Sequence, residues 1–176
     1  MPKSAARAAP IPPDVLPDVL GPGLRVVFCG SAAGAASARA GAYYAGPGNR
    51  FWPTLHRVGL TPRLLAPAEF RSVLDYRLGL TDLCKTESGA DSALSGRADD
   101  SAALAAKIAR HEPAILAFNG KRAARAFLGA GTLDYGERRE RIGGTAIHVL
   151  PSTSGAARRW WDETFWRRVA QAAQRA

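Results

Sequence analysis

The sequence predicts an α/β fold, a three-layer sandwich in which helices flank a central parallel sheet of four strands. Four short apolar runs rich in branched side chains alternate with stretches whose apolar residues recur at helical spacing. This alternation is typical of parallel sheets, because parallel strands need long crossover connections that helices usually supply. The predicted strands are residues 24–29, 78–81, 114–118 and 145–150. Loops at their carboxyl ends would share one rim, where ligands bind in open α/β sheets.

Residues 24–176 are predicted to form a single domain that follows an N-terminal tail, residues 1–23. A chain of 176 residues has the size of one domain, and it contains neither an internal repeat nor an interdomain linker. The tail is rich in alanine, and its prolines at positions 10, 12, 13, 17 and 22 block regular structure.

The first predicted strand leads directly into a long loop of small residues. The run LRVVFC is short for a helix and suits a strand that is buried on both faces. From position 30 to position 48 most residues are small, and Arg39, Tyr43 and Tyr44 interrupt them. Small residues let backbone amides approach a ligand, and the two rings offer a stacking face. A flexible connector is the alternative, but a binding loop is favoured because connectors seldom follow a core strand directly.

The rest of the chain supplies the other helices and two further loops. Asn49 can cap a helix that ends at Gly59 and buries Phe51, Trp52, Leu55 and Val58. Helices are also predicted at residues 67–76, 101–111 and 121–128, and a last helix carries Trp160, Trp161, Phe165, Trp166 and Val169. A polar turn over residues 82–91 follows the second strand, and a loop over residues 151–159 follows the fourth.

The charge of the chain indicates an anionic partner. The formal net charge is +9, and residues 121–176 hold 11 lysines or arginines against 5 acidic residues. Nucleic acid is the partner that this excess favours, and an acidic membrane surface is the weaker option.

The sequence also argues against several classes of protein. It contains neither a signal-peptide pattern nor a run that approaches the roughly 18 apolar residues of a membrane span, so a cytoplasmic protein without a membrane partner is expected. The two cysteines, Cys29 and Cys84, are predicted to be reduced structural thiols. No CxxC pair or histidine cluster indicates a metal site, and no histidine suggests a catalytic triad.

Five motifs in a fixed order resemble the mismatch-specific uracil-DNA glycosylase and thymine-DNA glycosylase family of the uracil-DNA glycosylase superfamily. They are VVFCGSAAG, AGPGNRFW, LDYRLGLTDL, AFNGK and LPSTSG, and together they span roughly residues 24–166. The resemblance implies a monomeric DNA repair enzyme that flips uracil out of DNA and hydrolyses its N-glycosidic bond by water attack at C1′, leaving an abasic site. Other deaminated or modified bases are further candidate substrates. The reaction needs no cofactor and no metal, and a prokaryotic member would be associated with the nucleoid.

The sequence departs from this family at two functional positions. Where the family reads GINPG, with an asparagine that positions the attacking water, this chain reads GSAAG and has Ala32. Where the family reads NPSGLS, with a bulky residue that wedges into the base stack, this chain has Ala156. Flipping should therefore favour loosely paired bases, as in a mismatch or a single strand.

Two interpretations of the missing asparagine compete. The chain could be a catalytically weak or inactive protein that binds damaged or mismatched DNA, or another polar residue could have taken over the activation of water. Asp82 is the best substitute because it ends a strand at the same rim, where a carboxylate could orient water and offset positive charge on the sugar. The structural alternative for Asp82 is a turn residue that caps nearby amides.

The resemblance also implies the residues that would contact DNA. Tyr44 would stack on the flipped base, and backbone groups of Ser31, Ala32 and Ala45 would bind its edge, with Asn49 also counted among the substrate-binding residues. Phosphates would be contacted through Lys121 and the loop after the fourth strand, which supplies Ser154, Gly155, Ala156, Arg158 and Arg159.

Overall fold

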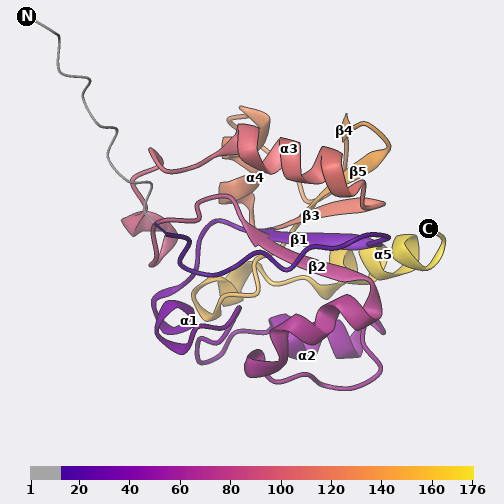
Figure 1. Ribbon diagram of the computed structural model, residues 1–176, viewed down its shortest axis with the longest axis horizontal. Helices are drawn as coiled ribbons and strands as arrows, with labels where there is room; N and C mark the ends of the chain where they lie inside the picture. Colours follow the sequence, from indigo (N-terminus) through magenta and orange to yellow (C-terminus); the bar gives the residue numbers. More distant parts are fainter. Residues whose placement is uncertain (1–12) are drawn as a thin grey trace, which may run out of the picture.

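The structure is a computed structural model that describes residues 13–176, so residues 1–12 of the predicted tail lie outside the described part. Its sheet has five strands in the order β2-β1-β3-β5-β4. The four predicted strands are confirmed as β1 (Val26–Gly30), β2 (Leu78–Asp82), β3 (Ile115–Asn119) and β5 (Thr145–Leu150), which run parallel. The fold is the predicted α/β sandwich with helices on both faces of the sheet (Figure 1).

The fifth strand, β4 (Gly136–Ile142), was not expected from the sequence. It pairs antiparallel with β5 at the edge of the sheet and reads GERRERI. Its side chains are exposed or half-buried, whereas the four predicted strands are fully buried. An edge strand of this kind carries charges in place of an apolar run, so the pattern that identifies buried strands misses it.

The helices differ from the expected ones mainly in type. The α-helices are α1 (Ala35–Ala40), α2 (Phe51–Arg57), α3 (Ser101–His111), α4 (Lys121–Leu128) and α5 (Glu163–Gln174). Three 3-10 helices are η1 (Pro67–Tyr76), η2 (Asp91–Ala93) and η3 (Gly155–Trp160). The helix predicted at 67–76 is thus a 3-10 helix, and the predicted last helix is divided into η3 and α5, with Trp160 in η3. The helix α1 lies inside the predicted binding loop.

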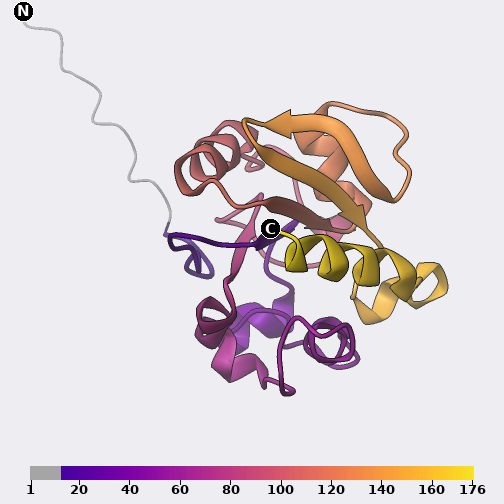
Figure 2. The same ribbon diagram turned by 90° about the vertical axis from the view of Figure 1, so that its right-hand side faces the viewer.

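Two apolar cores lie on opposite faces of the sheet. Along β1, Val26 and Phe28 belong to the core beneath α2 and α5, while Val27 and Cys29 belong to the core beneath α3 and α4. Successive strand residues point to opposite faces, so one fully buried strand supplies both cores. Figure 2 shows the helix layers on the two sides of the sheet.

An aromatic column runs through the first of these cores. Phe28 stacks on Trp166 with ring centroids 5.4 Å apart, and Phe51 meets Phe28 edge to face at 5.4 Å and Trp166 at 6.0 Å. All three side chains have 0% relative exposure. The column joins the beginning of α2 to α5, and aromatic pairs of this geometry add about 0.5–1.5 kcal/mol each beyond the area they bury.

The described part of the predicted tail packs against the domain. Leu16 and Val19 are buried, and the backbones of Val19 and Leu80 exchange two hydrogen bonds of 2.9 Å. Asp18 accepts one hydrogen bond from the Thr81 hydroxyl at 2.7 Å, and it pairs with Lys85 at 2.8 Å and Lys107 at 2.6 Å. This segment covers the outer edge of β2, which would otherwise present unpaired backbone groups. No helix in residues 13–176 is long and apolar enough to cross a membrane.

Candidate active site

The site is built where β1 and β2 end side by side. Gly30 and Asp82 are partners in the parallel register of these strands. A β-carbon on residue 30 would lie 2.5 Å from Oδ1 of Asp82, closer than such contacts occur, so only glycine leaves room for the carboxyl group. Asp82 itself is 5% exposed. The end of β1 therefore shapes a buried space that the Asp82 side chain enters.

The surroundings of Asp82 favour its protonated form. Burial raises the pKa of this carboxyl to about 7, an effect that the nearby Lys85 opposes and the Asp18 carboxylate reinforces. The Lys85 ammonium is held by Asp18 and by the Leu16 carbonyl at 2.6 Å. Within residues 13–176, the Asp82 carboxyl receives no hydrogen bond from the protein. A carboxyl with a pKa near neutrality can exchange protons at physiological pH, as a general base must.

Tyr44 lies on the other side of Gly30. Its ring stacks on Phe51 with centroids 3.9 Å apart, and its hydroxyl would be 3.4 Å from a β-carbon on residue 30. Burial raises the pKa of the Tyr44 hydroxyl well above its ordinary value, and the Asp82 charge adds to this effect. The backbone of Tyr44 has a φ of 53°, a left-handed conformation that is costly for an aromatic residue and is common at functional sites.

The Tyr44 hydroxyl is buried without a hydrogen-bond partner among residues 13–176. Asn119, at the end of β3, lies near enough for its amide to lower the Tyr44 pKa, while its amide oxygen and one N–H are bonded to Thr153. An unsatisfied buried hydroxyl costs about 1–3 kcal/mol. Beside a carboxyl without a donor, it marks a place where one small polar molecule would satisfy both groups.

Two cavities flank this pair of side chains. Asp82 lines one of about 200 Å³ together with Lys85 and Lys107. Tyr44 lines a larger one of about 370 Å³, which includes Ala45, Asn49 and apolar side chains such as Trp52 and Leu65. The larger volume lies within the roughly 300–1,000 Å³ typical of small-ligand sites. Because Phe51 covers one face of the Tyr44 ring, a base could stack only on the other face.

The other predicted substrate-binding residues lie in the same loop but have partners of their own. The Ser31 carbonyl accepts a 2.8 Å bond from the Cys84 amide, which joins the loops after β1 and β2. The Ala45 amide donates to the Ser37 hydroxyl at 3.1 Å. The Ala45 carbonyl is therefore the backbone group of this residue that could accept a hydrogen bond from a base. The Asn49 side-chain oxygen accepts a 3.0 Å bond from the Phe51 amide, but the N-cap of α2 is Arg50 and not Asn49 as predicted, so Asn49 lies one residue before the cap. Ala32 is half-buried and carries no polar side-chain atom.

The loop after β5 lies against the loop after β1. The Arg50 amide donates to the Thr153 carbonyl at 2.9 Å, and Gly155 packs on the Pro47 and Gly48 backbone. The Ser154 hydroxyl accepts from the Ala156 amide at 3.3 Å and caps η3. These contacts make the two loops one continuous rim.

The predicted phosphate-binding cations lie on two different helices. Arg158 and Arg159 are exposed on η3. Lys121 begins α4, and its ammonium lies 4.3 Å from the centroid of the Tyr135 ring. The structure adds Arg50, whose guanidinium lies 5.6 Å from the Trp161 ring centroid and has a buried Nη1 without a partner in residues 13–176. Arg50 belongs to the motif AGPGNRFW, but nothing in the sequence indicated that it contacts DNA or differs in role from the other residues at the start of this helix.

The family of the chain follows from its match to known proteins. The family model described as "Uracil DNA glycosylase superfamily" matches residues 17–173. The chain belongs to this superfamily. The fold agrees, because the chain is similar to the solution NMR structure of a candidate uracil DNA glycosylase from Methanosarcina acetivorans, with a TM-score of 0.65 and 25% sequence identity. That match covers 90% of this chain and 96% of the other.

Membership of the uracil DNA glycosylase superfamily supports a DNA glycosylase role, with DNA as the partner. The match begins at residue 17 and so includes part of the segment predicted as a tail. Within residues 13–176 no group of three or more histidine, cysteine or acidic residues could hold a metal ion.

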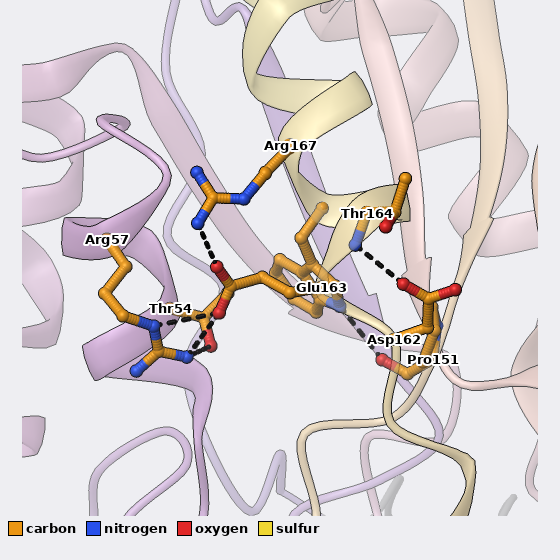
Figure 3. A network of polar contacts seen from close by, with 8 residues as sticks. Thr54, Arg57, Pro151, Asp162, Glu163, Thr164 and Arg167 are labelled. Atoms are coloured by element: carbon orange, nitrogen blue, oxygen red, sulfur yellow. Dashed lines mark hydrogen bonds and ion pairs between the residues drawn. The ribbon is translucent and has the colours of Figure 1, made fainter.

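The rim that this superfamily member presents is anchored from behind by the start of α5 (Figure 3). Glu163 pairs with Arg57 of α2 at 2.7 Å and with Arg167 at 2.6 Å, while Asp162 caps the helix through the Thr164 amide at 2.9 Å. The indole of Trp166 donates to the Pro151 carbonyl at 3.0 Å, at the beginning of the loop after β5. The aromatic column therefore holds this loop directly.

Proposed function

We propose that this protein is a monofunctional DNA glycosylase of the mismatch-specific uracil-DNA and thymine-DNA glycosylase type, which removes uracil from DNA and acts as a monomer. One observation carries the proposal. A buried carboxyl with a pKa near 7, Asp82, lies at the carboxyl end of β2, beside the buried Tyr44 hydroxyl, which has no hydrogen-bond partner among residues 13–176.

The two groups suit the activation of a water molecule. A water between them would accept a hydrogen bond from the Tyr44 hydroxyl and donate one to the Asp82 carboxylate, which satisfies both. This arrangement takes over the task of the asparagine that Ala32 replaces. The cavity of about 200 Å³ that reaches Asp82 from the α3 side is large enough to supply such a water.

The chemistry then requires one proton acceptor. The bond between C1′ of the sugar and N1 of uracil breaks, and its electron pair leaves with the base. The water oxygen attacks C1′ while its proton passes to the Asp82 carboxylate. Before the attack, the same carboxylate stabilises the positive charge that develops on the sugar, and its burial strengthens that interaction.

The base and the DNA strand would be held by the rim. The free face of the Tyr44 ring would stack on the flipped base, and backbone groups of Ser31 and Ala32 would bind its edge. Small side chains in this loop leave space for other deaminated or modified bases. Exposed Arg158 and Arg159 would contact phosphates, in keeping with the formal net charge of +9.

The test is single-turnover excision of uracil from U:G, U:A and single-stranded oligonucleotides, with alkali used to reveal abasic sites. The wild-type protein should cleave, and Asp82→Asn should lower the rate by about two or more orders of magnitude while DNA affinity stays the same. The rate should rise with pH through about 7, because only the ionised carboxyl accepts a proton. Asp75→Asn, at an exposed position of η1, is the matched control and should leave the rate unchanged.

A second candidate function is a protein that binds damaged or mismatched DNA without cleaving it. The observation that favours it is the absence of a polar side-chain atom at Ala32. Tight binding to uracil-containing DNA, combined with complete inactivity on all three substrates, would establish this function. Near wild-type excision by Asp82→Asn would instead show that Asp82 is a turn residue and that water is activated elsewhere.

A further inference from the structure

Trp160 is the sole exposed aromatic side chain in residues 13–176. It is 63% exposed at the end of η3, whereas Trp52 and Trp166 are buried and Trp161 is half-buried. An aromatic side chain of this size buries roughly 150–250 Å² when it is covered. Because Trp160 is exposed, the folded protein lacks the hydrophobic stabilisation that this burial would give. Neither the fold nor the proposed chemistry accounts for a tryptophan in this place.

The backbone that carries Trp160 is held firmly. Ser154 caps η3, Gly155 packs on the Pro47 and Gly48 backbone, and Trp161 packs on Trp166 with ring centroids 6.1 Å apart. Figure 2 shows this short turn at the outer end of α5, on the right of the view. The exposed ring is therefore presented from a fixed rim and does not lie on a free chain end.

The charges around Trp160 suit a nucleic acid. Arg158 and Arg159 precede it, and the Arg159 guanidinium lies 5.1 Å from the Trp160 ring centroid. Neither arginine has an acidic partner among residues 13–176. Cations beside an exposed aromatic ring match the two parts of a DNA strand, which are phosphates on the outside and flat bases within.

We infer that Trp160 enters the base stack of duplex DNA and fills the space that the flipped nucleotide leaves. Ala156, at the position where the resemblance expects a bulky wedge, offers one methyl group, and Trp160 lies four residues later in the same 3-10 helix. Apolar side chains that wedge between base pairs unstack them and kink the duplex. The inference rests on the proposed function for its substrate and names the residue that gives access to paired bases.

A wedge at Trp160 would extend flipping from the loosely paired bases that the sequence favours to fully paired ones. A duplex must be opened before a base can leave it, whereas a single strand needs no wedge. Trp160 should therefore contribute most for U:A pairs, less for U:G mismatches and nothing for single-stranded uracil. A residue that merely supports the fold would affect all three substrates equally.

The experiment compares Trp160→Ala with Trp160→Phe, which keeps an aromatic ring, and with Leu74→Ala, which truncates an apolar side chain that is 38% exposed on η1. In single-turnover excision, Trp160→Ala should lose about tenfold or more on U:A duplex and change by less than about twofold on single-stranded uracil. Trp160→Phe should keep most of the duplex rate, and Leu74→Ala should match the wild type. An unchanged duplex rate, or an equal loss on both substrates, overturns the inference.

A second measurement separates this inference from the proposed function. A duplex with 2-aminopurine next to a uracil mismatch becomes brighter when the stack is opened, whether or not a bond is cleaved. The wild type and Trp160→Phe should raise this fluorescence on binding, and Trp160→Ala should not. If the wild type cleaves no uracil but still gives this result, the proposed function fails while the wedge is supported. If Trp160→Ala raises the fluorescence as the wild type does, the wedge is overturned even where cleavage is intact.

Discussion

Replacing Asp82 by asparagine should stabilise the protein at neutral and alkaline pH. In the folded protein burial raises the pKa of this carboxyl from 3.8 to about 7, whereas in the unfolded chain it is exposed to water. Between these values the folded state holds a proton that the unfolded state has lost, so stability falls as the pH rises from about 4 to about 7. Each unit of pKa corresponds to about 1.4 kcal/mol, so the buried charge costs about 4 kcal/mol above pH 7. Asparagine has nearly the same shape and never carries this charge.

The assay is urea denaturation of the wild type and Asp82→Asn at pH 4, 6 and 8. The variant should be more stable by about 2–4 kcal/mol at pH 8, and the difference should shrink below about 1 kcal/mol at pH 4. Asp75→Asn, at an exposed position, should show no such trend. If Asp82→Asn is no more stable at pH 8 than at pH 4, the carboxyl does not bury an unfavourable charge, and its assignment as a general base loses its basis.

Two further predictions concern the rim and the strand end. Replacing Arg158 and Arg159 by alanine should weaken binding to all DNA sequences alike and reduce the slope of log affinity against log salt by about 2, measured by fluorescence anisotropy; an unchanged slope would place the phosphate-binding surface elsewhere. Gly30→Ala should lower uracil excision by about tenfold to a hundredfold without weakening DNA binding, because the new β-carbon would lie 2.5 Å from Oδ1 of Asp82 and displace the carboxyl. Gly34→Ala, where the added β-carbon meets open space, is the control, and equal effects of the two substitutions would contradict this reading.

The buried strands could be predicted because burial on both faces leaves a simple pattern. The segments 24–29 and 145–150 contain short apolar runs that fit a buried strand better than a helix, and both contain strands in the structure. The strand β4 was not predicted because its exposed, charged residues form no apolar run. The helix α1 was not predicted because a short segment of small residues, flanked by glycine, is compatible with both a loop and a helix.

A site residue could be predicted only where its position along a strand or helix determines where it lies in the fold. Asp82 lies at the rim because it ends a parallel strand, and the sequence shows that directly. The left-handed backbone of Tyr44 and the burial of its hydroxyl depend on contacts with Phe51 and Gly30, which lie at other positions of the chain. The separation of Trp160 from the last helix depends equally on tertiary contacts, since its apolar spacing suits that helix well.

The aromatic column links the ring proposed to stack on the base to the loop proposed to contact the DNA strand. Phe51 supports the ring of Tyr44 on one side and touches Trp166 on the other, and Trp166 holds the carbonyl of Pro151. A change in one ring is expected to displace its neighbours, because close-packed interiors resist compression and transmit strain. Under the proposed function, a change in this column is therefore expected to alter base specificity and DNA affinity together. A smaller residue at Phe51 would widen the pocket beside Tyr44, and it would also require repacking around Trp166 and the loop after β5.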